Sequence, residues 1–567
     1  MQAELVNGTD RSTDWQSVNW RKANRMVRNL RQRIFKAAQA EDWNKVRSLQ
    51  KLMLRSYSNT LVSVRRVTQE NKGKRTHGVD GVKILTPEGR GRMVDLMMTF
   101  QPWRVRPALR VYIPKANGKQ RPLGIPTVMD RCLQARVKNA LEPRWEAKFE
   151  ASSYGFRPGR NQHDAISHIF NFAKTGKRQW IVDADIKGAF DNIAHEYLLQ
   201  TIGDVPGKEL IKKWLKAGYV EHGAFHPTPT GTPQGGVISP LLANIALHGM
   251  EAALGIKYDT DGRLHGSTAL VRYADDFVVL CNTRYHAEQV IRTLKGWLAE
   301  RGLSLSEEKT RIVRLTEGFD FLGFNIRQYP VVYRRRGAIC LIKPSKEAVQ
   351  RHRNEMREEW ASLKGKPVAT VINALGPKIR GWANYHRRVV AKQTFQNLDR
   401  WMFRRECRYV SFSHPGRPRK WTQRRYWGKL AEERNDHWVF GDKSTGAYLP
   451  KYAWTKIVRH VKVKGRASPD DPSLKEYWKE RSKAGAKDLR PSYQKIAQTQ
   501  DHTCPICGET LYNDEELQKD HVQPRHRGGS DSYDNYQLLH ADCHKQKTAV
   551  ERTKREPTRR WLRKWLA

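Results

Sequence analysis

The sequence has few acidic residues and no long apolar run, and each shortage excludes a class of protein. Its 58 Asp and Glu stand against 104 Lys and Arg, which leaves a net charge of +46. Such a field attracts polyanions and makes their binding strongly salt-dependent through counterion release. The mean hydropathy is −0.75 and no stretch of about 20 apolar residues occurs, so no membrane partner is expected.

Cysteine is also scarce, with seven in 567 residues, three of them near the C-terminal end. This odd number argues against a disulfide framework and for a reducing compartment, which we expect to be the bacterial cytoplasm. The opening segment MQAELVNGTDRSTDWQ is polar and contains acids, unlike a signal peptide or a typical transit peptide. A chain of this length predicts about three to five domains.

Two adjacent carboxylates in LVRYADDFVVL are the most informative short feature of the chain. Apolar β-branched runs flank the motif, which predicts a hairpin with Asp275 and Asp276 at its tip. Like charges side by side repel, and a nearby core strengthens that repulsion unless a divalent cation offsets it. An Asp-Asp pair alone is usually a solvated turn, so a further carboxylate is needed to favour a metal site.

WIVDADIKGAFDNI supplies that carboxylate. An apolar run leads into Asp183, Asp185 and Asp191, a pattern that predicts a buried strand turning into a helix with Asp191 near its start. If this strand pairs with the hairpin, Asp185 and Asp275 can share two Mg²⁺ ions. Two such ions activate a 3′-hydroxyl and stabilise a pyrophosphate leaving group.

These segments resemble the palm of a reverse transcriptase, and the YADD box with its flanks is similar to that of group II intron-encoded proteins. The resemblance continues along the chain in a constant order. RVYIPKANGKQRPLGIPTVMDR resembles the fingers, and SYGFRPGR resembles a signature of bacterial intron enzymes. GTPQGGVISPLLANIAL resembles the loop and helix under the incoming nucleotide, and GLSLSEEKTRIV and FDFLGFNI resemble the next motif and the primer grip.

The resemblance assigns polymerase roles residue by residue. Asp185 and Asp275 would hold magnesium, Asp276 would be the adjacent catalytic acid, and Asp183 has no catalytic part in the family pattern. Phe190 stands where relatives carry an aromatic steric gate against the ribose 2′-hydroxyl, with ordinary core packing as its alternative.

Other residues are expected to contact the nucleotide or the template. Basic side chains of the fingers would bind phosphates. Gly235 and Gly236 would let nucleic acid approach the backbone, because neither has a Cβ. The expected contacts are Lys115, Lys119, Arg121, Phe190, Gln234, Gly235 and Lys309.

Basic regions lie on both sides of the palm. Residues 14 to about 100 show helical spacing and resemble the N-terminal extension of intron enzymes, which would contact template and intron RNA. Residues 351–430 carry 20 basic and 5 acidic residues and resemble the thumb and maturase domain, whose basic faces would grip RNA phosphates. Trp382 and Tyr385 could serve there or in the core. Residues 431–495, with a loop at SPDDPS and a helix after it, correspond to a DNA-binding region or to a linker.

The C-terminal segment carries a second set of metal-ligand residues. Cys504 and Cys507 form half of a zinc site, and His540 with Cys543 completes a Cys₃His tetrahedron. The family pattern usually has a cysteine where His540 stands, so an incomplete site is the alternative.

The same segment resembles an HNH nuclease of the ββα-metal type. His521 would be the general base that deprotonates water, and Asp520 and His544 would hold one divalent cation. Asn535 would orient the hairpin and thereby His521. A zinc knuckle with incidental histidines is the plainer alternative.

These features predict a multidomain α+β protein, with the fingers and palm of a right-hand reverse transcriptase, a helical thumb/maturase domain and a zinc-containing ββα-metal HNH module. The expected boundaries are 1–100 for the N-terminal extension and start of the fingers, 101–335 for fingers and palm, 336–430 for the thumb/maturase domain, 431–495 for the DNA-binding region and 496–567 for the nuclease.

The family implies a polymerase, maturase and site-specific endonuclease that acts in target-primed reverse transcription during intron mobility. Its cofactors would be Mg²⁺ and a structural Zn²⁺. Its partners would be group II intron RNA, target DNA and dNTPs, with the oligomeric state open and a dimer among the options. The rivals are a reverse transcriptase unrelated to introns, a splicing factor descended from an enzyme, and a homing endonuclease with a vestigial palm. The intact YADD and fingers motifs oppose the last two.

Overall fold

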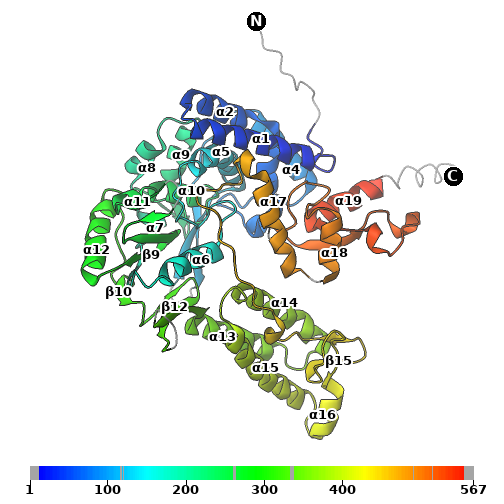
Figure 1. Ribbon diagram of the computed structural model, residues 1–567. Coiled ribbons are helices and arrows are strands. Elements are labelled where there is room, and N and C mark those ends of the chain that lie inside the picture. Colours follow the sequence, from blue (N-terminus) through cyan, green and yellow to red (C-terminus); the bar gives the residue numbers. More distant parts are fainter. Residues whose placement is uncertain are drawn as a thin grey trace, which may run out of the picture.

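Four helices form most of the N-terminal part of the described chain. The computed structural model describes residues 12–553 apart from 115–117, 119, 260–262, 333–336, 490 and 514. Each of the first four helices starts at a side chain that accepts a hydrogen bond from a backbone N–H of the first turn. The helices are α1 (Trp20–Gln39), α2 (Trp43–Arg55), α3 (Tyr57–Arg65) and α4 (Pro87–Met98). The first three pack on α5 (Val128–Glu146), so the extension is part of the polymerase body (Figure 1).

A four-stranded sheet forms the fingers. Its strands, in the order β2-β1-β4-β5, are β2 (Gln120–Ile125), β1 (Ala108–Pro114), β4 (Tyr219–Glu221) and β5 (Ala224–His226). Lys115 and Lys119, which were expected to bind phosphates, lie outside the described residues.

The palm sheet is buried on both faces, which explains its continuous apolar runs. Its strands, in the order β10-β3-β9-β8, are β10 (Arg311–Arg314), β3 (Trp180–Asp185), β9 (Asp276–Cys281) and β8 (Ala269–Tyr273). Val182 and Val279 pack in the core that includes α12 (Arg284–Ala299), whereas Ile181 and Val278 pack in the core that includes α6 (Gln162–Ala173). Neighbouring residues of one strand thus serve opposite layers.

The thumb follows a three-stranded sheet and is helical, as predicted. The strands are β11 (Phe319–Phe321), β12 (Phe324–Pro330) and β13 (Ala338–Pro344), and the helices are α13 (Lys346–Ser362), α14 (Val368–His386), α15 (Lys392–Ser413) and α16 (Arg419–Tyr426). Trp382 stacks on His352 with centroids 4.9 Å apart, and Tyr385 stacks on Phe324 and donates a hydrogen bond to the Leu322 carbonyl. Trp382 and Tyr385, whose roles the sequence left open, therefore both pack against other side chains.

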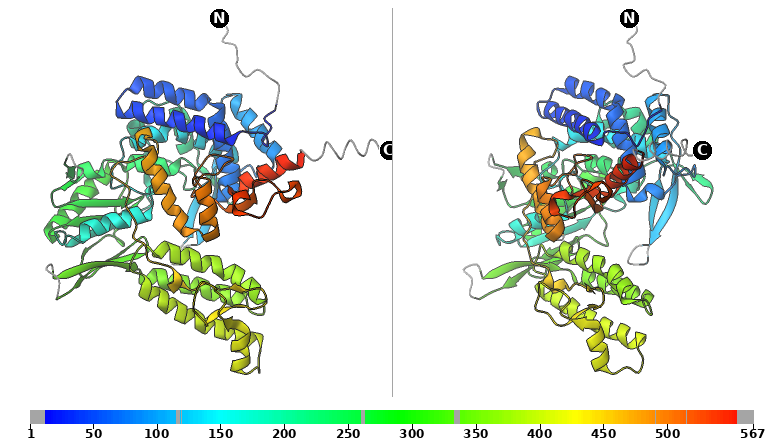
Figure 2. Two further views of the ribbon diagram at one scale, coloured as in Figure 1. Left: turned by 45° about the vertical axis from the view of Figure 1, so that its right-hand side comes forward. Right: turned by 90° about the vertical axis from the view of Figure 1, so that its right-hand side faces the viewer.

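The region after α16 divides between the thumb and the palm. A small sheet of β14 (Trp427–Gly428), β15 (Val439–Asp442) and β16 (Ala447–Tyr448) packs on α14 and α16, beyond the expected thumb boundary at residue 430. Residues 455–470 then return from the thumb along α6 to the N-terminal helices (Figure 2). This return segment is held by Asp164, which accepts hydrogen bonds from the Val463 amide and from His460 at 2.9 Å each and from Arg481 at 2.6 Å.

A ββα module ends the described chain, after α17 (Lys475–Lys483) and α18 (Pro491–Thr499). It consists of β17 (Leu517–His521), antiparallel to β18 (Tyr536–His540), and α19 (Ala541–Thr553), and it lies beside the N-terminal helices (Figures 1 and 2). All seven cysteines are in the described residues and are free thiols. No helix within the described ranges is long and apolar enough to cross a bilayer. The predicted fold class is confirmed.

Candidate active sites

The palm sheet brings the three predicted polymerase carboxylates together. Asp185, the last residue of β3, pairs with Asp276, the first residue of β9, in antiparallel register. Ala274 and Asp275 form the two-residue turn between β8 and β9, and Ala274 takes a left-handed backbone conformation with φ of 59°. The predicted pairing of the acidic strand with the YADD hairpin is therefore present.

Two of these acids, Asp275 and Asp276, resist ionisation. Burial, a hydrogen bond with Asp185 and the charge of Asp275 raise the pKa of Asp276 to about 8. Burial and the charge of Asp185 also raise the pKa of Asp275. Lys309 donates a hydrogen bond to Asp185 Oδ2 at 2.6 Å, so the ammonium partly offsets the negative charge. A cluster of acids that disfavours its own charge is the environment in which divalent cations bind.

A cavity of about 330 Å³ opens beside these acids. Asp185, Asp276 and Lys309 line it, together with Asp183, whose Oδ2 accepts a hydrogen bond from Arg311 at 3.0 Å. Burial raises the pKa of Asp183, yet its partner is an arginine and not another acid of the cluster. Asp183 thus shares the cavity with Asp185 and Asp276 but is paired with Arg311.

The YADD turn rests on residues that our reading of the sequence missed. A Cβ on Gly155 would lie 2.3 Å from the Ala274 amide nitrogen, so the SYGFRPGR loop packs directly against the YADD turn. Arg272 is fully buried and donates to the Ala274 carbonyl and to Asn244 Oδ1, each at 3.1 Å. Asn244 donates in turn to the Gly155 carbonyl at 2.8 Å. An arginine inside the apolar run before YADD was the available signal.

The four predicted zinc ligands converge in the C-terminal module. One ligand atom from each of Cys504, Cys507, His540 and Cys543 lies within 4.8 Å of all the others, and all four residues are buried. No other group of three or more such residues is this close within the described ranges. His540 presents Nδ1 to Cys507 Sγ at 3.4 Å, while Nε2 lies 3.1 Å from the Thr510 carbonyl. That carbonyl can accept a hydrogen bond from Nε2–H, which leaves Nδ1 free as a ligand, so the cluster could bind zinc.

The nuclease residues lie at the junction of β17 and α19. His544 Nε2 is 3.4 Å from Asp520 Oδ1, and Lys547 donates to Asp520 Oδ2 at 2.6 Å. His521 Nε2 is 2.8 Å from Asp531 Oδ1. Lys547 and Asp531 were not expected from the sequence, although both lie close to predicted residues.

Asn535 joins the two sides of the loop between β17 and β18. It accepts a hydrogen bond from the Gln523 amide at 2.8 Å and donates to the carbonyls of Gln523 and Ser530 at 2.9 and 2.8 Å. A Cβ on Gly529 would lie 1.8 Å from the Gln523 carbonyl oxygen, so this loop accepts only glycine there. Asn535 therefore stands where it can orient the strand end that carries His521.

Four family models match the chain in the order of these parts. They are "N-terminal domain of reverse transcriptase" at residues 15–97, "Reverse transcriptase (RNA-dependent DNA polymerase)" at 113–326, "Group II intron, maturase-specific domain" at 349–427 and "HNH endonuclease" at 504–549.

Two relatives add to this. Protein YkfC of Escherichia coli (strain K12) is 35% identical over 307 residues, 47% of this chain and 80% of that protein. Group II intron-encoded protein LtrA of Lactococcus lactis subsp. cremoris is 32% identical over 392 residues, 57% of this chain and 63% of LtrA. The chain belongs to the family of group II intron-encoded proteins. A telomerase structure from Candida albicans reaches a TM-score of only 0.32 at 12% identity over 55% of this chain and 58% of that chain, too low to support an argument.

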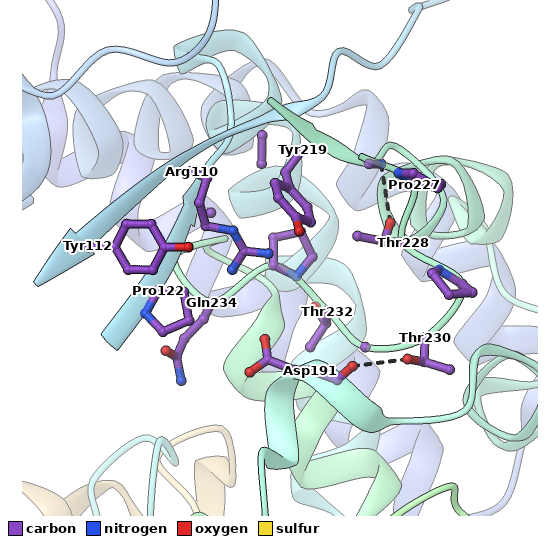
Figure 3. Close-up of a pocket in the computed structure, with 16 residues that line it drawn as sticks. Arg110, Tyr112, Pro122, Asp191, Tyr219, Pro227, Thr228, Thr230, Thr232 and Gln234 are labelled. Atoms are coloured by element: carbon purple, nitrogen blue, oxygen red, sulfur yellow. Dashed lines mark hydrogen bonds between the residues drawn. The ribbon is translucent and has the colours of Figure 1, made fainter. Parts of the chain in front are cut away.

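In this intron-encoded protein a cavity of about 350 Å³ separates the fingers from the loop before α10 (Ser239–Ala246) (Figure 3). Gln234 and Arg110 line it, and the Arg110 guanidinium lies 3.8 Å from the centroid of the Tyr219 ring. Asp191 reaches it from α7 (Ala189–Asn192), in whose first turn it was expected. A cation, an amide and an aromatic ring thus share one cavity beside the palm.

Two expectations for the nucleotide side remain predictions. The direction that a Cβ would take from each glycine after Gln234 is filled by the protein: a Cβ on Gly235 would meet the Gly124 carbonyl oxygen at 2.7 Å, and one on Gly236 would meet Ser239 Oγ at 2.7 Å. Both are small because the loop packs closely on the protein itself. Phe190 is 8% exposed and lies edge-on to Phe156 at 6.1 Å, a position that neither supports nor opposes the steric gate.

Proposed function

We propose that this protein copies intron RNA into DNA at the palm, assists splicing through its thumb/maturase domain, and nicks target DNA with its C-terminal module. The observation that carries the proposal is the pairing of Asp185 with the YADD hairpin, which collects three acids at one end of a buried sheet. A splicing factor with a decayed palm would have no need to retain that costly cluster.

At the palm, Asp185 and Asp275 would hold Mg²⁺, and Asp276 would support them as the adjacent acid. The bound ions would activate the primer 3′-hydroxyl and stabilise the leaving pyrophosphate. Lys309 would exchange its bond to Asp185 for a nucleotide phosphate once cations neutralise the acid.

Around the incoming nucleotide, Gln234 and Gly235 would form the floor, and Phe190 would exclude a 2′-hydroxyl. Lys115, Lys119 and Arg121 would contact phosphates from the fingers. The expected selectivity is for dNTPs paired to an RNA template.

In the C-terminal module, His521 would take a proton from the attacking water. Its contact with Asp531 would hold the ring in place. Asp520 and His544 would hold a divalent cation that neutralises the scissile phosphate. Cys504, Cys507, His540 and Cys543 would hold a structural Zn²⁺.

These activities fit one cycle in the bacterial cytoplasm. The basic thumb would grip the phosphates of the intron RNA, which confers position rather than sequence. The RNA would enter one strand of the target DNA, the nuclease would nick the other, and the palm would extend the new 3′-end. A polymerase needs a primer, and the nick supplies it.

The test uses the full-length protein with its intron RNA. Asp275→Ala combined with Asp276→Ala should abolish cDNA synthesis and leave splicing intact, while Asp183→Asn, two residues from Asp185 on the same strand, should retain both. His521→Ala should remove nicking and therefore cDNA synthesis on an intact target, while splicing persists. A target that is already nicked should restore cDNA synthesis by this variant. Loss of splicing in a folded palm mutant, or nicking by the His521 variant, would refute the division of labour.

A further inference from the structure

The structure assigns a second role to the zinc-ligand cluster: we propose that it is the surface by which the nuclease module docks on the N-terminal extension, with Arg65 as the positioning residue that makes docking depend on the metal. The inference rests on the proposed zinc binding and not on nuclease activity.

The module and the extension share one hydrophobic core. Trp20 and Val64 of the extension belong to the same buried cluster as Cys504, Leu538 and Cys543. Figures 1 and 2 show the module beside the N-terminal helices in each view. The contact is a packed interface, not a tether between independent domains.

Arg65 is the centre of this interface. It ends α3, is 4% exposed, and its Nη2 lies 3.1 Å from Cys543 Sγ. Its guanidinium lies 4.5 Å from the centroid of the Trp20 ring, and Nε lies 3.1 Å from Glu70 Oε1. Nε and Nη1 are both buried without a hydrogen-bond partner among the described residues.

This placement couples charge on the sulfurs to docking. Three thiolates around Zn²⁺ leave net negative charge on the centre, and the buried guanidinium compensates it with a charge-assisted hydrogen bond. Without the metal nothing holds the four ligands at one point, so the sulfur that Arg65 contacts and the zinc loop that meets α1 lose their fixed positions. The buried guanidinium then lacks a fixed partner on the module, which opposes burial of that surface, so loss of metal should favour undocking.

Contacts around Arg65 show that the zinc loop itself meets α1. Asn24 donates a hydrogen bond to the Cys507 carbonyl at 3.1 Å. Gly508 has φ of 70°, and a Cβ there would lie 3.0 Å from Arg21 Cγ. Arg28 forms an ion pair with Glu509.

The nuclease residues are more exposed to solvent than the zinc ligands. The side chains of His521 and His544 are 22% and 32% exposed, whereas the zinc ligands are buried. Docking therefore holds the module on the polymerase body while His521 stays open to solvent.

The experiment measures zinc release and hydrogen exchange in full-length protein of known zinc content. Arg65→Met removes the charge but keeps much of the length, and Arg66→Met is the matched control, because Arg66 also pairs with Glu70 but its side chain is 66% exposed. Arg65→Met should weaken zinc binding by ~10–100-fold, as for other partners of metal ligands. It should also speed exchange in residues 20–28 and 504–511 together, while Arg66→Met changes neither.

Cys543→Ser tests the same coupling from the metal side and covers the case in which Arg65→Met fails to fold. It should release zinc and speed exchange in residues 20–28, while exchange in α5 stays unchanged. Unaltered exchange in residues 20–28 after zinc loss would overturn the docking role. Absence of zinc from the wild-type protein would instead overturn the metal premise.

Discussion

Gly155→Ala should slow the polymerase severely without unfolding the protein. The added Cβ would lie 2.3 Å from the Ala274 amide nitrogen and 2.9 Å from the Tyr273 carbonyl carbon. Non-bonded heavy atoms prefer ~3.5 Å, so the YADD turn must recede by about 1 Å. Overpacking of this kind costs ~1–3 kcal/mol of stability, which a core of this size can absorb.

The kinetic effect should be larger than the stability effect, because Asp275 follows Ala274 directly in the turn. A misplacement of about 1 Å at a reacting group costs ~100-fold in rate, or ~2.7 kcal/mol of activation free energy. Single-nucleotide extension of an annealed primer on an RNA template measures this at saturating dNTP. Gly296→Ala is the matched control, since Gly296 lies in α12 on the same palm with nothing within 4 Å of its Cβ position. Extension by Gly155→Ala within about twofold of wild type, in a folded protein, would refute the view that this glycine positions the turn.

Three further predictions concern titration, a buried ion pair and the nuclease loop. Because the pKa of Asp276 is raised to about 8 from an ordinary value near ~3.9, its ionisation should destabilise the metal-free protein as pH rises between those values. In EDTA the wild-type melting midpoint should therefore fall more over that range than the midpoint of Asp276→Asn, and equal slopes would contradict the shift. Arg157→Met should cost ~3–5 kcal/mol, because Arg157 and Glu146 form a 2.9 Å ion pair whose side chains are each 1% exposed. Denaturant unfolding checks this against Arg284→Met, whose partner Glu288 is exposed, and similar midpoints for the two variants would count against it. Asn535→Ala removes three hydrogen bonds of ~1 kcal/mol each and should lower nicking at least about tenfold while zinc content and primer extension persist. Undiminished nicking would show that the loop does not depend on Asn535.

Local patterns were sufficient for the elements that carry the chemistry. The acidic strand and the YADD hairpin are short apolar runs that carry carboxylates at their ends, and the ββα module is marked by the spacing of its cysteines and histidines. Their pairing partners follow from the family order of motifs. Predictions of this kind need little knowledge of distant contacts.

Side-chain contacts between residues far apart in the sequence were not predictable in the same way. Arg272 stands out in the sequence as an arginine inside an apolar run, but its contact with Asn244 does not follow from that pattern. Asp470 lies in the predicted SPDDPS loop, yet its carboxylate forms a buried ion pair with Arg31 at 2.7 Å. The zinc ligands were visible as a set, but nothing in their spacing indicates that Arg65 of α3 contacts Cys543. Such contacts depend on how separate modules pack, which local periodicity does not encode.

The hydrogen bond between Arg65 and Cys543 also affects when the N-terminal helices are completed during synthesis. The two residues are 478 positions apart, and ribosomes add ~5–20 residues each second, so α3 waits for roughly 25–100 s before its partner exists. Throughout that interval Trp20 and Arg65 lack the surface that covers them in the finished protein. Helices made early are therefore completed by a segment made 478 residues later.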